Sequence, residues 1–443
     1  MVSQISSPPG LILYDTLNNN EINELKRFVD TNKIDLNRML NHVRKRNHSG
    51  MCPIHLVVSK GYFDMLRYLI HSGVNVQQAT ATSKRRAVHY AALMRQASCM
   101  QLLINAGAKL EVYDIFGNTP LHYAAEDGDS GILCLLLNNG TNVDVRDITN
   151  KTPLIKASRN GRICAVRKLI NYGTQINLKD KQDETALHYA CRRGSVEIAC
   201  SLIKEEANMN VQNSMGMTPL MEAVAYNQSK TVIALVRFRN LDLYKRDYSS
   251  GDTALHIAIK KNYIQIVEIL LKACNWYIEY NFNNLGESFV HDVITQNRLD
   301  LLNLLLSFNY NFEQPAKKKM NIHLTNIFKS PFQIALEKGH YEICRILSEV
   351  FCYSISLNHI SISSLSFNKR MRKRYQCMSE VKSLKKWSRK AIRTYLGFNL
   401  PKTLPKLNLP ENLKEFILLD DIDWPTSESS LNRLKNPHAI SVN

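Results

Sequence analysis

Apolar residues recur along most of this chain in short groups with helical spacing, and a glycine separates one group from the next. In the segment that begins at Thr119, a first stripe ends before Gly128 and a second ends before Gly140. The first stripe contains Leu121, Ala124 and Ala125, and the second contains Ile132, Leu133, Leu136 and Leu137. Spacings of one, three and four place each group on one face of a helix. The pattern predicts two short helices per segment, and neither helix can bury its stripe alone.

Residues at the ends of these helices fit the positions that they would occupy. Thr119 is expected to be an N-cap, because its hydroxyl can accept a hydrogen bond from a backbone N–H that has no helical partner. Pro120 suits the first helical position, where no backbone donor is lost. Gly140 follows the second stripe, where a left-handed C-terminal cap is expected.

The two-helix segment is repeated at a nearly constant interval. Nine copies begin at Cys52, Arg86, Thr119, Thr152, Thr185, Thr218, Thr253, Ser288 and Ser330. Successive copies are 34, 33, 33, 33, 33, 35, 35 and 42 residues apart. A period near 33 predicts a stacked solenoid, in which stability is a sum of repeat and interface terms. The longest interval contains Lys317, Lys318 and Lys319 and is expected to form an exposed loop.

The repeated residues resemble the ankyrin repeat. The clearest copies are Thr-Pro-Leu-His at Thr119–His122 and Thr-Ala-Leu-His at Thr185–His188. The resemblance runs from about Cys52 to Leu347, and a weaker helical pair lies between Leu11 and Met39. It implies an all-α ankyrin-repeat solenoid of helix-turn-helix repeats with hairpin loops. We expect a helical capping pair over residues 1–48 and about nine repeats over residues 49–350.

Composition agrees with an intracellular binding scaffold. With 443 residues the chain is too long to fold around one compact hydrophobic core. A solenoid has no such size limit, because it grows in one dimension. No apolar run approaches the ~20 residues that span a bilayer, and residues 1–10 lack the features of a secretory signal. The ten cysteines show no Cys-x-x-Cys spacing, so reduced thiols are favoured over disulfides or a zinc site. The cytoplasm is the expected location, with the nucleus as the alternative.

Positive charge is concentrated after the repeats. Residues 369–406 contain 13 Lys or Arg and one acid, Glu380, which gives +12 of the chain's formal charge of +18. The densest run, Lys369 to Arg374, could be a nuclear localisation signal or a contact to nucleic acid phosphates. We favour a solvated basic linker over residues 351–378, because aromatic residues are too sparse for a nucleic-acid platform.

The apolar pattern changes downstream of the basic run. Starting at Leu384, one helical face is formed by Trp387, Ser388, Ala391, Ile392, Tyr395 and Leu396, and Gly397 ends the helix. A proline-rich joint follows, and a second amphipathic helix is expected behind Pro410 with Leu413, Phe416, Ile417 and Leu419. Two short helices and a stiff joint therefore lie outside the repeat array.

The segment Ser383–Arg393 resembles the first half of a SOCS box, and Leu407–Lys414 resembles the second half. We expect the SOCS box over residues 379–420 and a tail over residues 421–443. By this resemblance the elongin-binding residues are Leu384, Trp387, Ser388, Ile392 and Leu396, and the cullin-binding residues are Leu407, Leu409, Pro410 and Leu413. The sequence departs from the family at Ser388, which replaces the usual Cys, and at Asn408, which replaces the first Pro of Leu-Pro-Leu-Pro.

Ankyrin repeats followed by a SOCS box are typical of the ankyrin repeat and SOCS box family. The resemblance implies a substrate receptor whose array holds a target. Its tail would recruit elongins B and C together with cullin five, which brings a RING partner. One alternative is an ankyrin adaptor or sequestering protein that recruits no ligase, which Ser388 and Asn408 keep open. Another is a tail that only caps the solenoid. Nucleic-acid binding through Lys369 to Arg374 is a weaker third hypothesis.

Catalytic and metal-binding patterns are missing from the sequence. It has no phosphate loop of the G-x-x-x-x-G-K-[ST] type and no H-E-x-x-H helix, and we expect a non-catalytic chain without cofactors. Five histidines share one repeat position, where a structural hydrogen bond between repeats is expected: His55, His89, His122, His188 and His256. The segment from Asp127 to Gly131 imitates a calcium loop but lacks the distal bidentate Glu.

In ankyrin arrays the two residues before the inter-helix glycine face the concave surface. The members of this set that we select for target binding are Leu93, Met94, Arg159, Arg192, Arg193, Tyr226, Lys260 and Lys261. The clustered arginines predict an acidic or phosphorylated target segment, with a solvated charged face as the alternative. Tyr113 and Phe116 in a hairpin loop offer a second candidate surface, unless they pack on the adjacent loop.

Overall fold

The computed structural model describes residues 9–32, 36–37, 50–274, 283–284, 288–308, 331, 334–335 and 338–351. Its regular elements, within these ranges, are all helices, and an isolated antiparallel β-bridge joins Ala79 to Arg86. None of these helices is both long and apolar enough to cross a membrane. The chain divides into two compact units, Met1–Tyr248 and Ser249–Asn443.

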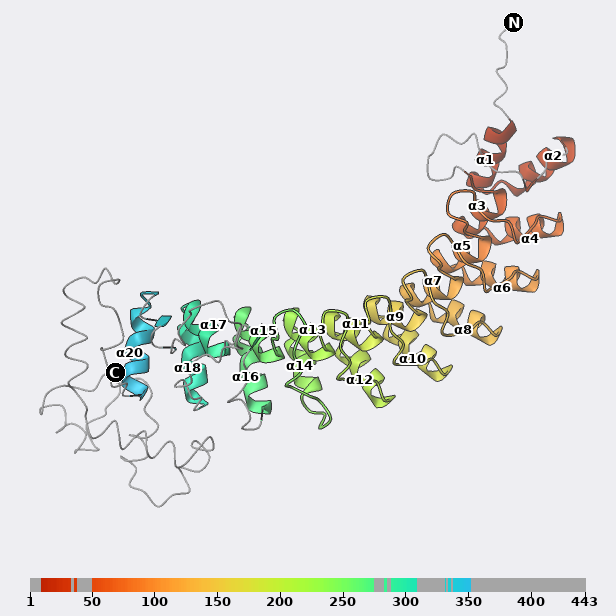
Figure 1. Ribbon diagram of the computed structural model, residues 1–443. Helices are drawn as coiled ribbons and strands as arrows, with labels where there is room; N and C mark the ends of the chain where they lie inside the picture. Colours follow the sequence, from red (N-terminus) through yellow and green to blue (C-terminus); the bar gives the residue numbers. More distant parts are fainter. Residues whose placement is uncertain are drawn as a thin grey trace, which may run out of the picture. The chain divides into compact units, whose positions relative to one another are not determined.

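Seven helical pairs follow one another in the described part of the first unit (Figure 1). The first pair is α1 (Pro9–Asn19) and α2 (Ile22–Asn32), and the second is α3 (Pro53–Lys60) and α4 (Phe63–His71). The others are α5 (Ala87–Leu93) with α6 (Ala97–Asn105), α7 (Pro120–Asp127) with α8 (Ser130–Asn138), α9 (Pro153–Asn160) with α10 (Ile163–Asn171), α11 (Ala186–Arg193) with α12 (Val196–Lys204), and α13 (Pro219–Ala225) with α14 (Ser229–Leu235).

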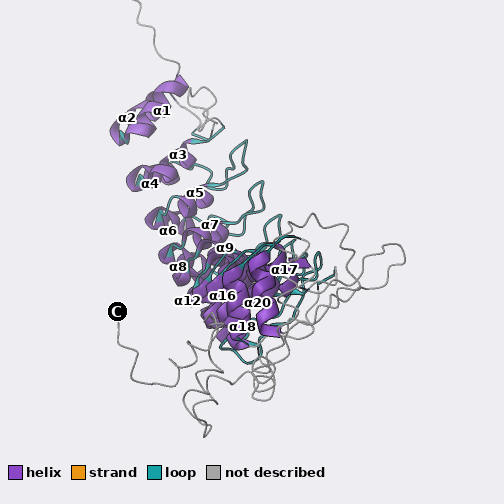
Figure 2. Cartoon of the chain, turned by 90° about the vertical axis from the view of Figure 1, so that its left-hand side faces the viewer, coloured by secondary structure: helices purple, strands orange, loops and turns teal. Residues whose placement is uncertain are grey.

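The helices of this unit form two rows. Helices α1, α3, α5, α7, α9, α11 and α13 pack in succession and make one row, and α4, α6, α8, α10, α12 and α14 make the other. Loops between repeats leave the stack on one side, which is clearest beside α3, α5 and α7 (Figure 2). This is the ankyrin-repeat solenoid that the regular period of the sequence predicts.

The apolar stripes of the sequence form the core between the rows. Leu121, Ala124 and Ala125 on α7 are almost fully buried, and the stripe of α8 is buried as well. Gly128 ends α7 with a φ of 83°, and Gly140 follows α8 with a φ of 76°. Both glycines therefore adopt the left-handed conformation expected at a helix end. The helix pair per repeat is confirmed, together with the residues that terminate its helices.

Every repeat origin among the described residues is the N-cap of its helix, from Cys52 to Ser288. Ser330 and the lysine run 317–319 lie outside the described residues. The hydroxyls of Thr152 and Thr218 accept from the backbone N–H three residues later, at 3.3 and 3.2 Å. At Thr119 the hydroxyl instead lies 3.0 Å from Nδ1 of His122, so the cap uses the imidazole.

A histidine at the third helical position joins its own repeat to the next one. In α7 the backbone N–H of Thr119 donates to Nδ1 of His122 at 3.0 Å. Because Nδ1 accepts, the proton resides on Nε2, which donates to the carbonyl of Lys151 at 3.0 Å. His55, His89 and His188 repeat this arrangement toward the carbonyls of Gln78, Val112 with Asn118, and Met217 respectively. The structural role predicted for these histidines is confirmed.

Hairpin loops of neighbouring repeats are also joined by backbone hydrogen bonds. The N–H groups of Ile115, Ile148, Lys181, Ser214 and Tyr248 donate to the carbonyls of Ser83, Phe116, Thr149, Gln182 and Met215, at 2.9 to 3.1 Å. Close approach requires a glycine at Gly216, which has a φ of 79°. A Cβ there would lie 2.4 Å from the backbone nitrogen of Tyr248.

The second unit contains five described helices: α15 (Ala254–Lys260), α16 (Ile264–Ala273), α17 (Phe289–Thr295), α18 (Leu299–Ser307) and α20 (Tyr341–Phe351). Helix α15 packs on α16 and α17, and α18 packs on α16 and α17. The pairs α15 with α16 and α17 with α18 therefore repeat the arrangement of the first unit. His256 and His291 accept from the N-cap N–H groups of Thr253 and Ser288, as in the first unit.

Candidate target-binding surface

The residues that the sequence analysis selects for target binding differ in their exposure. Met94, Arg159, Arg193, Tyr226 and Lys261 are exposed. Leu93, Arg192 and Lys260 are half-buried. Lys260 and Lys261 belong to the second unit, so the candidate surface is described for the first unit alone.

Arg192 is held by two carboxylates, and here the structure differs from the expectation of a free cation. Its Nε lies 2.9 Å from Oε2 of Glu222, and its other nitrogens donate to Glu184. Both carboxylates are almost fully buried. The guanidinium also lies 5.2 Å from the ring centre of Tyr189 and 5.7 Å from that of Tyr226. Arg192 is therefore neutralised within the repeat stack, and Lys260 is similarly paired with Asp252 at 2.6 Å.

Ionisation of this cluster follows from its contacts. Burial alone would raise the pKa of Glu184, but hydrogen bonds and the charge of Arg192 hold that pKa below its usual value. Burial alone would lower the pKa of Arg192, and the two carboxylates raise it instead. Glu184 and Arg192 therefore remain charged at neutral pH. The cluster therefore ties α11 to α13, and it leaves the ring of Tyr226 exposed.

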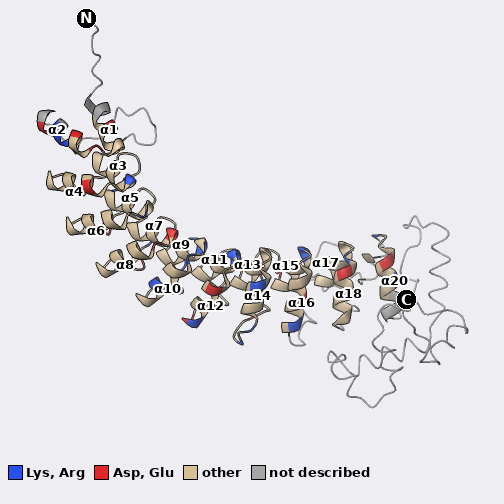
Figure 3. Ribbon diagram, turned by 180° about the vertical axis from the view of Figure 1, so that it is seen from behind, with Lys and Arg blue, Asp and Glu red and all other residues tan. Residues whose placement is uncertain are grey.

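Three exposed arginines on neighbouring repeats form a cationic strip, which we define as Arg159, Arg162 and Arg193. Nη1 of Arg193 donates to the carbonyl of Arg159 at 3.4 Å, and Nε of Arg162 donates to that of Glu126 at 3.2 Å. Both contacts place positive charge at the carbonyl end of a helix in the preceding repeat, α9 or α7. Each guanidinium has five donors, so most remain for another molecule. Figure 3 shows the basic positions on α9 and α11.

Sequence reasoning missed Arg162, because it lies after the inter-helix glycine, outside the pair of positions that usually faces the concave surface. Its long side chain extends back over Gly128 of the preceding repeat. The same packing brings Arg193 over Gly161. The signal that could have identified Arg162 is a long side chain that packs over the inter-helix glycine of the preceding repeat.

Exposed apolar residues gather at two neighbouring hairpin loops. Tyr113, Ile115, Phe116 and Ile148 are each at least 44 % exposed. We call these four residues the loop patch. The structure thus leaves Tyr113 and Phe116 largely in solvent, although Phe116 accepts a backbone hydrogen bond from Ile148 at 3.1 Å. Both residues retain the exposure that a second binding surface requires.

The calcium-like segment uses its carboxylates for structure. Asp129 caps α8 by accepting from the N–H groups of Gly131 and Ile132, both at 2.9 Å. Asp127 binds the guanidinium of Arg95 in the preceding repeat. Each carboxylate therefore has a partner within the chain. In the part of the chain that the structure describes, no group of three His, Cys, Asp or Glu side chains could hold a metal ion.

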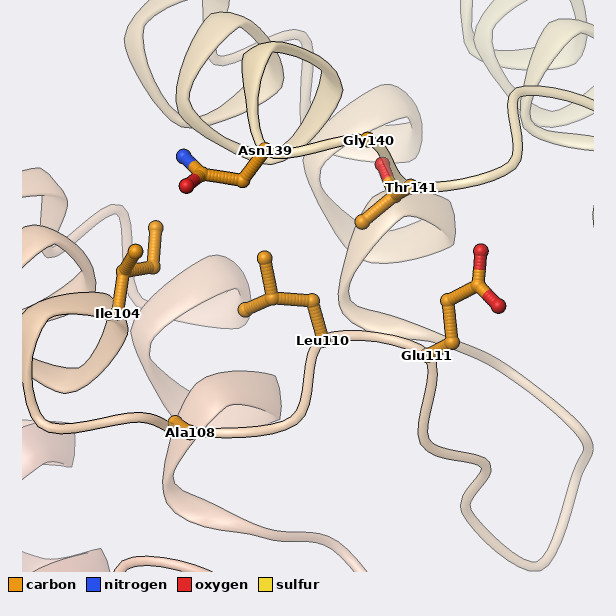
Figure 4. Close-up of a pocket in the computed structure, with 7 residues that line it drawn as sticks. All are labelled: Ile104, Ala108, Leu110, Glu111, Asn139, Gly140 and Thr141. Carbon is orange, nitrogen blue, oxygen red and sulfur yellow. The ribbon is translucent and has the colours of Figure 1, made fainter.

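A shallow pocket of about 330 Å³ lies between the ends of α6 and α8 (Figure 4). The side chains of Ile104 and Leu110 point toward Asn139 there. Its polar side chains are already bonded, since Asn139 and Thr141 donate to main-chain carbonyls and Glu111 accepts from the N–H of Asn142. These contacts stabilise the loops between repeats and leave no set of converging groups for catalysis.

Buried histidines are equally unsuited to acid–base chemistry near neutral pH. Burial lowers the pKa of His55, His89 and His122 to about 4, although hydrogen bonds to carbonyls partly oppose this. Burial also lowers the pKa of His188. A general base requires a reachable proton and a pKa near the working pH. These imidazoles are neutral, enclosed and bonded on both nitrogens.

Residues selected for elongin and cullin binding lie outside the described residues. They are Leu384, Trp387, Ser388, Ile392 and Leu396 for elongin, and Leu407, Leu409, Pro410 and Leu413 for the cullin. The basic run Lys369 to Arg374 and Asn408 also lie outside them.

Family comparisons cover both parts of the chain. A model of ankyrin repeats in sets of three copies matches residues 13–114, 54–147, 88–180, 154–247 and 241–316. A model of the SOCS box matches residues 380–418. The two matches follow one another without overlap, and the second contains every residue selected for elongin and cullin binding.

Individual similar proteins share the repeat part. The ankyrin repeat protein FPV031 of Fowlpox virus (strain NVSL) is 30% identical over 133 residues, which are 30% of this chain and 36% of that protein. The crystal structure of the human ASB11 ankyrin repeat domain aligns with a TM-score of 0.47 and 24% identity. That alignment covers 51% of this chain and 99% of the human domain.

Proposed function

Because this chain belongs to the ankyrin repeat and SOCS box family, we propose that it is the substrate-recognition subunit of an elongin-cullin-RING ubiquitin ligase. The observation that carries the proposal is the succession, in one chain, of ankyrin repeats over residues 13–316 and a SOCS box at 380–418. A receptor of this kind needs one surface for the target and a separate one for the ligase. The array and the tail would supply these surfaces.

The tail would engage its partners through two groups of residues. Leu384, Trp387, Ser388, Ile392 and Leu396 would contact elongin C, which pairs with elongin B. Leu407, Leu409, Pro410 and Leu413 would contact the cullin, for which we propose cullin five. Ser388 places a hydroxyl where the family usually has Cys, and leaving it without a partner would cost on the order of 1 kcal/mol. The chain would bring target and ligase together and catalyse no step itself.

We further propose that the target is a protein segment with carboxylates or phosphates. The cationic strip supports this choice, because its guanidiniums can hold such groups with paired hydrogen bonds. The exposed ring of Tyr226 lies one repeat further along. The ten cysteines of the sequence show no Cys-x-x-Cys spacing, which favours reduced thiols and a reducing compartment such as the cytoplasm.

Leu384→Asp is expected to abolish capture of the elongin B/C dimer by the purified full chain. A charge on an apolar anchor would be desolvated in the elongin pocket without a counter-charge. The matched control is Leu431→Asp, which places the same charge in the tail beyond the SOCS box match. Capture of elongin B/C is measured first and capture of the cullin second. Each measurement uses the parent chain, Leu384→Asp and Leu431→Asp. A parent chain that fails to capture elongin would leave the adaptor hypothesis instead.

Reversing two charges of the strip, with Arg159→Glu and Arg193→Glu, is expected to reduce target capture sharply while elongin capture is unchanged. The changed carboxylates would repel an acidic segment at the two places where it is held. Proteins retained by each chain under proteasome inhibition would be quantified by mass spectrometry. The control is Arg67→Glu, an exposed arginine on α4. Identical retention by the double variant and the parent would exclude the strip as the target surface.

A further inference from the structure

A cysteine and a lysine from successive repeats meet on the outer row of helices. Cys134 lies on α8 and is half-buried, and Lys168 lies on α10, which packs against α8. The ammonium nitrogen Nζ of Lys168 donates to Sγ of Cys134 at 2.9 Å. The side chain of Tyr172, the C-cap residue that follows α10, donates to Asn138 on α8. The two helices are therefore joined by side chains at two successive turns.

The repeat array contains an unpaired counterpart of this arrangement. Cys200 on α12 follows Thr185, the first residue of its repeat, at the same interval as Cys134 follows Thr119, the first residue of the earlier repeat. The position that Lys168 occupies relative to Thr152, the first residue of its repeat, is taken in the repeat of Thr218 by Ala234 on α14. Cys200 and Ala234 are half-buried like their counterparts, and α12 packs on α14. The same fold position is thus present once with an amine beside the thiol and once without.

Contact with an ammonium group changes what a thiol can do. The thiolate is the reactive form of cysteine, and an adjacent positive charge stabilises it. The hydrogen bond to Cys134 raises the pKa of Lys168, so the amine is held as an ammonium group beside the sulfur. Because Cys134 is partly exposed, small oxidants can reach it. Cys164 lies one turn before Lys168 on α10, is more exposed, and also raises the pKa of Lys168 electrostatically. It therefore provides an internal reference for a thiol that is near the same amine, while the hydrogen bond of Lys168 goes to Cys134.

We propose that Cys134 and Lys168 form an oxidant-responsive pair, in which a hydroperoxide converts the thiol–amine contact into a covalent sulfur–nitrogen bond between two repeats. In the first step the thiolate attacks a peroxide oxygen, an S–O bond forms, and the O–O bond breaks. The departing hydroxide takes a proton from the Lys168 ammonium and leaves as water. Sulfur is oxidised to the sulfenic acid and the peroxide is reduced.

In the second step the neutral amine of Lys168 attacks the sulfenic sulfur. The S–N bond forms as the S–O bond breaks, and the hydroxide leaves with a proton from the nitrogen as a second water. The sum for hydrogen peroxide is one thiolate, one ammonium and one peroxide giving one sulfenamide and two waters. Thiols would reverse the bond by exchange at sulfur. Oxidation would thus tie α8 to α10, independently of whether the tail recruits a ligase.

The test is peptide mapping by mass spectrometry after the full chain is exposed to dilute hydrogen peroxide. The expected product is a crosslinked peptide pair that joins Cys134 to Lys168, lacks two hydrogens, and separates after thiol treatment. Cys164 and Cys200 are expected to give no crosslink to any lysine. Oxidation of Cys134 without the crosslink, or to the same extent as Cys164, would refute the proposal.

Two variants separate the pair from general accessibility. Lys168→Ala reproduces the residue that the fold already accepts at Ala234, and it is expected to remove the crosslink while far-ultraviolet circular dichroism stays unchanged. Ala234→Lys places an amine beside Cys200, where a second crosslink is expected to appear. If Ala234→Lys forms no crosslink to Cys200 while α14 remains folded, an amine at the equivalent position of the neighbouring repeat does not suffice for the reaction. That result would contradict the proposal.

Discussion

Arg192→Met is expected to lower the free energy of unfolding of the array by about 3–5 kcal/mol, because it leaves two buried carboxylates without a counter-charge. Glu184 and Glu222 are 5% and 3% exposed, and Arg192 hydrogen-bonds to both of them. Asn213 also donates to both carboxylates at 3.3 Å, but an amide cannot neutralise them. Methionine keeps most of the side-chain volume between the rings of Tyr189 and Tyr226. Urea denaturation followed by circular dichroism measures the loss.

Arg193→Met is the matched control, because the neighbouring arginine is exposed and makes one long hydrogen bond at 3.4 Å. Its loss is expected to change the free energy of unfolding by less than about 1 kcal/mol. Adding Glu184→Gln and Glu222→Gln to Arg192→Met is expected to recover much of the stability, since the stranded charges are then removed. Equal losses for Arg192→Met and Arg193→Met would mean that the carboxylates do not depend on Arg192.

Local features of the repeat could be predicted from the sequence because short-range rules determine them. The N-cap position of Thr119 and the left-handed glycine Gly128 depend on residues within one helical turn, and the structure confirms both. The hydroxyl of Thr119, however, contacts the imidazole of His122 and not a backbone N–H. Helical period alone identifies the buried face that includes Leu121. Nine copies in phase also predict that the repeats stack, since no single copy can bury its own stripe.

The state of each concave side chain could not be predicted in the same way. Arg192 precedes the inter-helix glycine, and this position is exposed at Arg159 in the previous repeat. Its partners lie 8 residues earlier, at Glu184, and 30 residues later, at Glu222. No rule of spacing within one repeat brings these groups together. Whether an arginine here is free or neutralised depends on which residues the neighbouring repeats supply.

Contacts between outer helices were missed for the same reason. Cys134 and Lys168 are separated by 34 residues, one more than the period, and each has an ordinary place on an amphipathic helix. Comparing equivalent positions, as between Lys168 and Ala234, would have revealed that the sequence varies there. The SOCS box could be located only by its resemblance, because two amphipathic helices behind a basic run also fit a simple helical cap.

Acidification is expected to destabilise the array over the range from about pH 6.5 down to about pH 4. Burial lowers the pKa of His55, His89 and His122 in the folded protein to about 4, whereas an unfolded histidine has a pKa of about 6.5. Their contribution to stability is complete above pH 6.5 and is lost as the pH falls toward the folded value. Each histidine is expected to reduce stability by about 1.4 kcal/mol per pH unit in this range. Urea denaturation at several pH values measures the slope.

A single substitution tests whether the buried histidines cause this slope. His122→Ile copies Ile155, which occupies the same helical position in the next repeat without an imidazole. The variant is expected to be less stable near pH 7.5, because the carbonyl of Lys151 and the N–H of Thr119 lose their partner. It is also expected to lose less stability between pH 6.5 and pH 4, because one group that binds a proton on unfolding is gone. Asp114 and Asp147 have pKa values below the usual range for a carboxylate, so their protonation adds to the loss only toward more acidic pH. An unchanged slope in His122→Ile would assign the acid sensitivity to other groups.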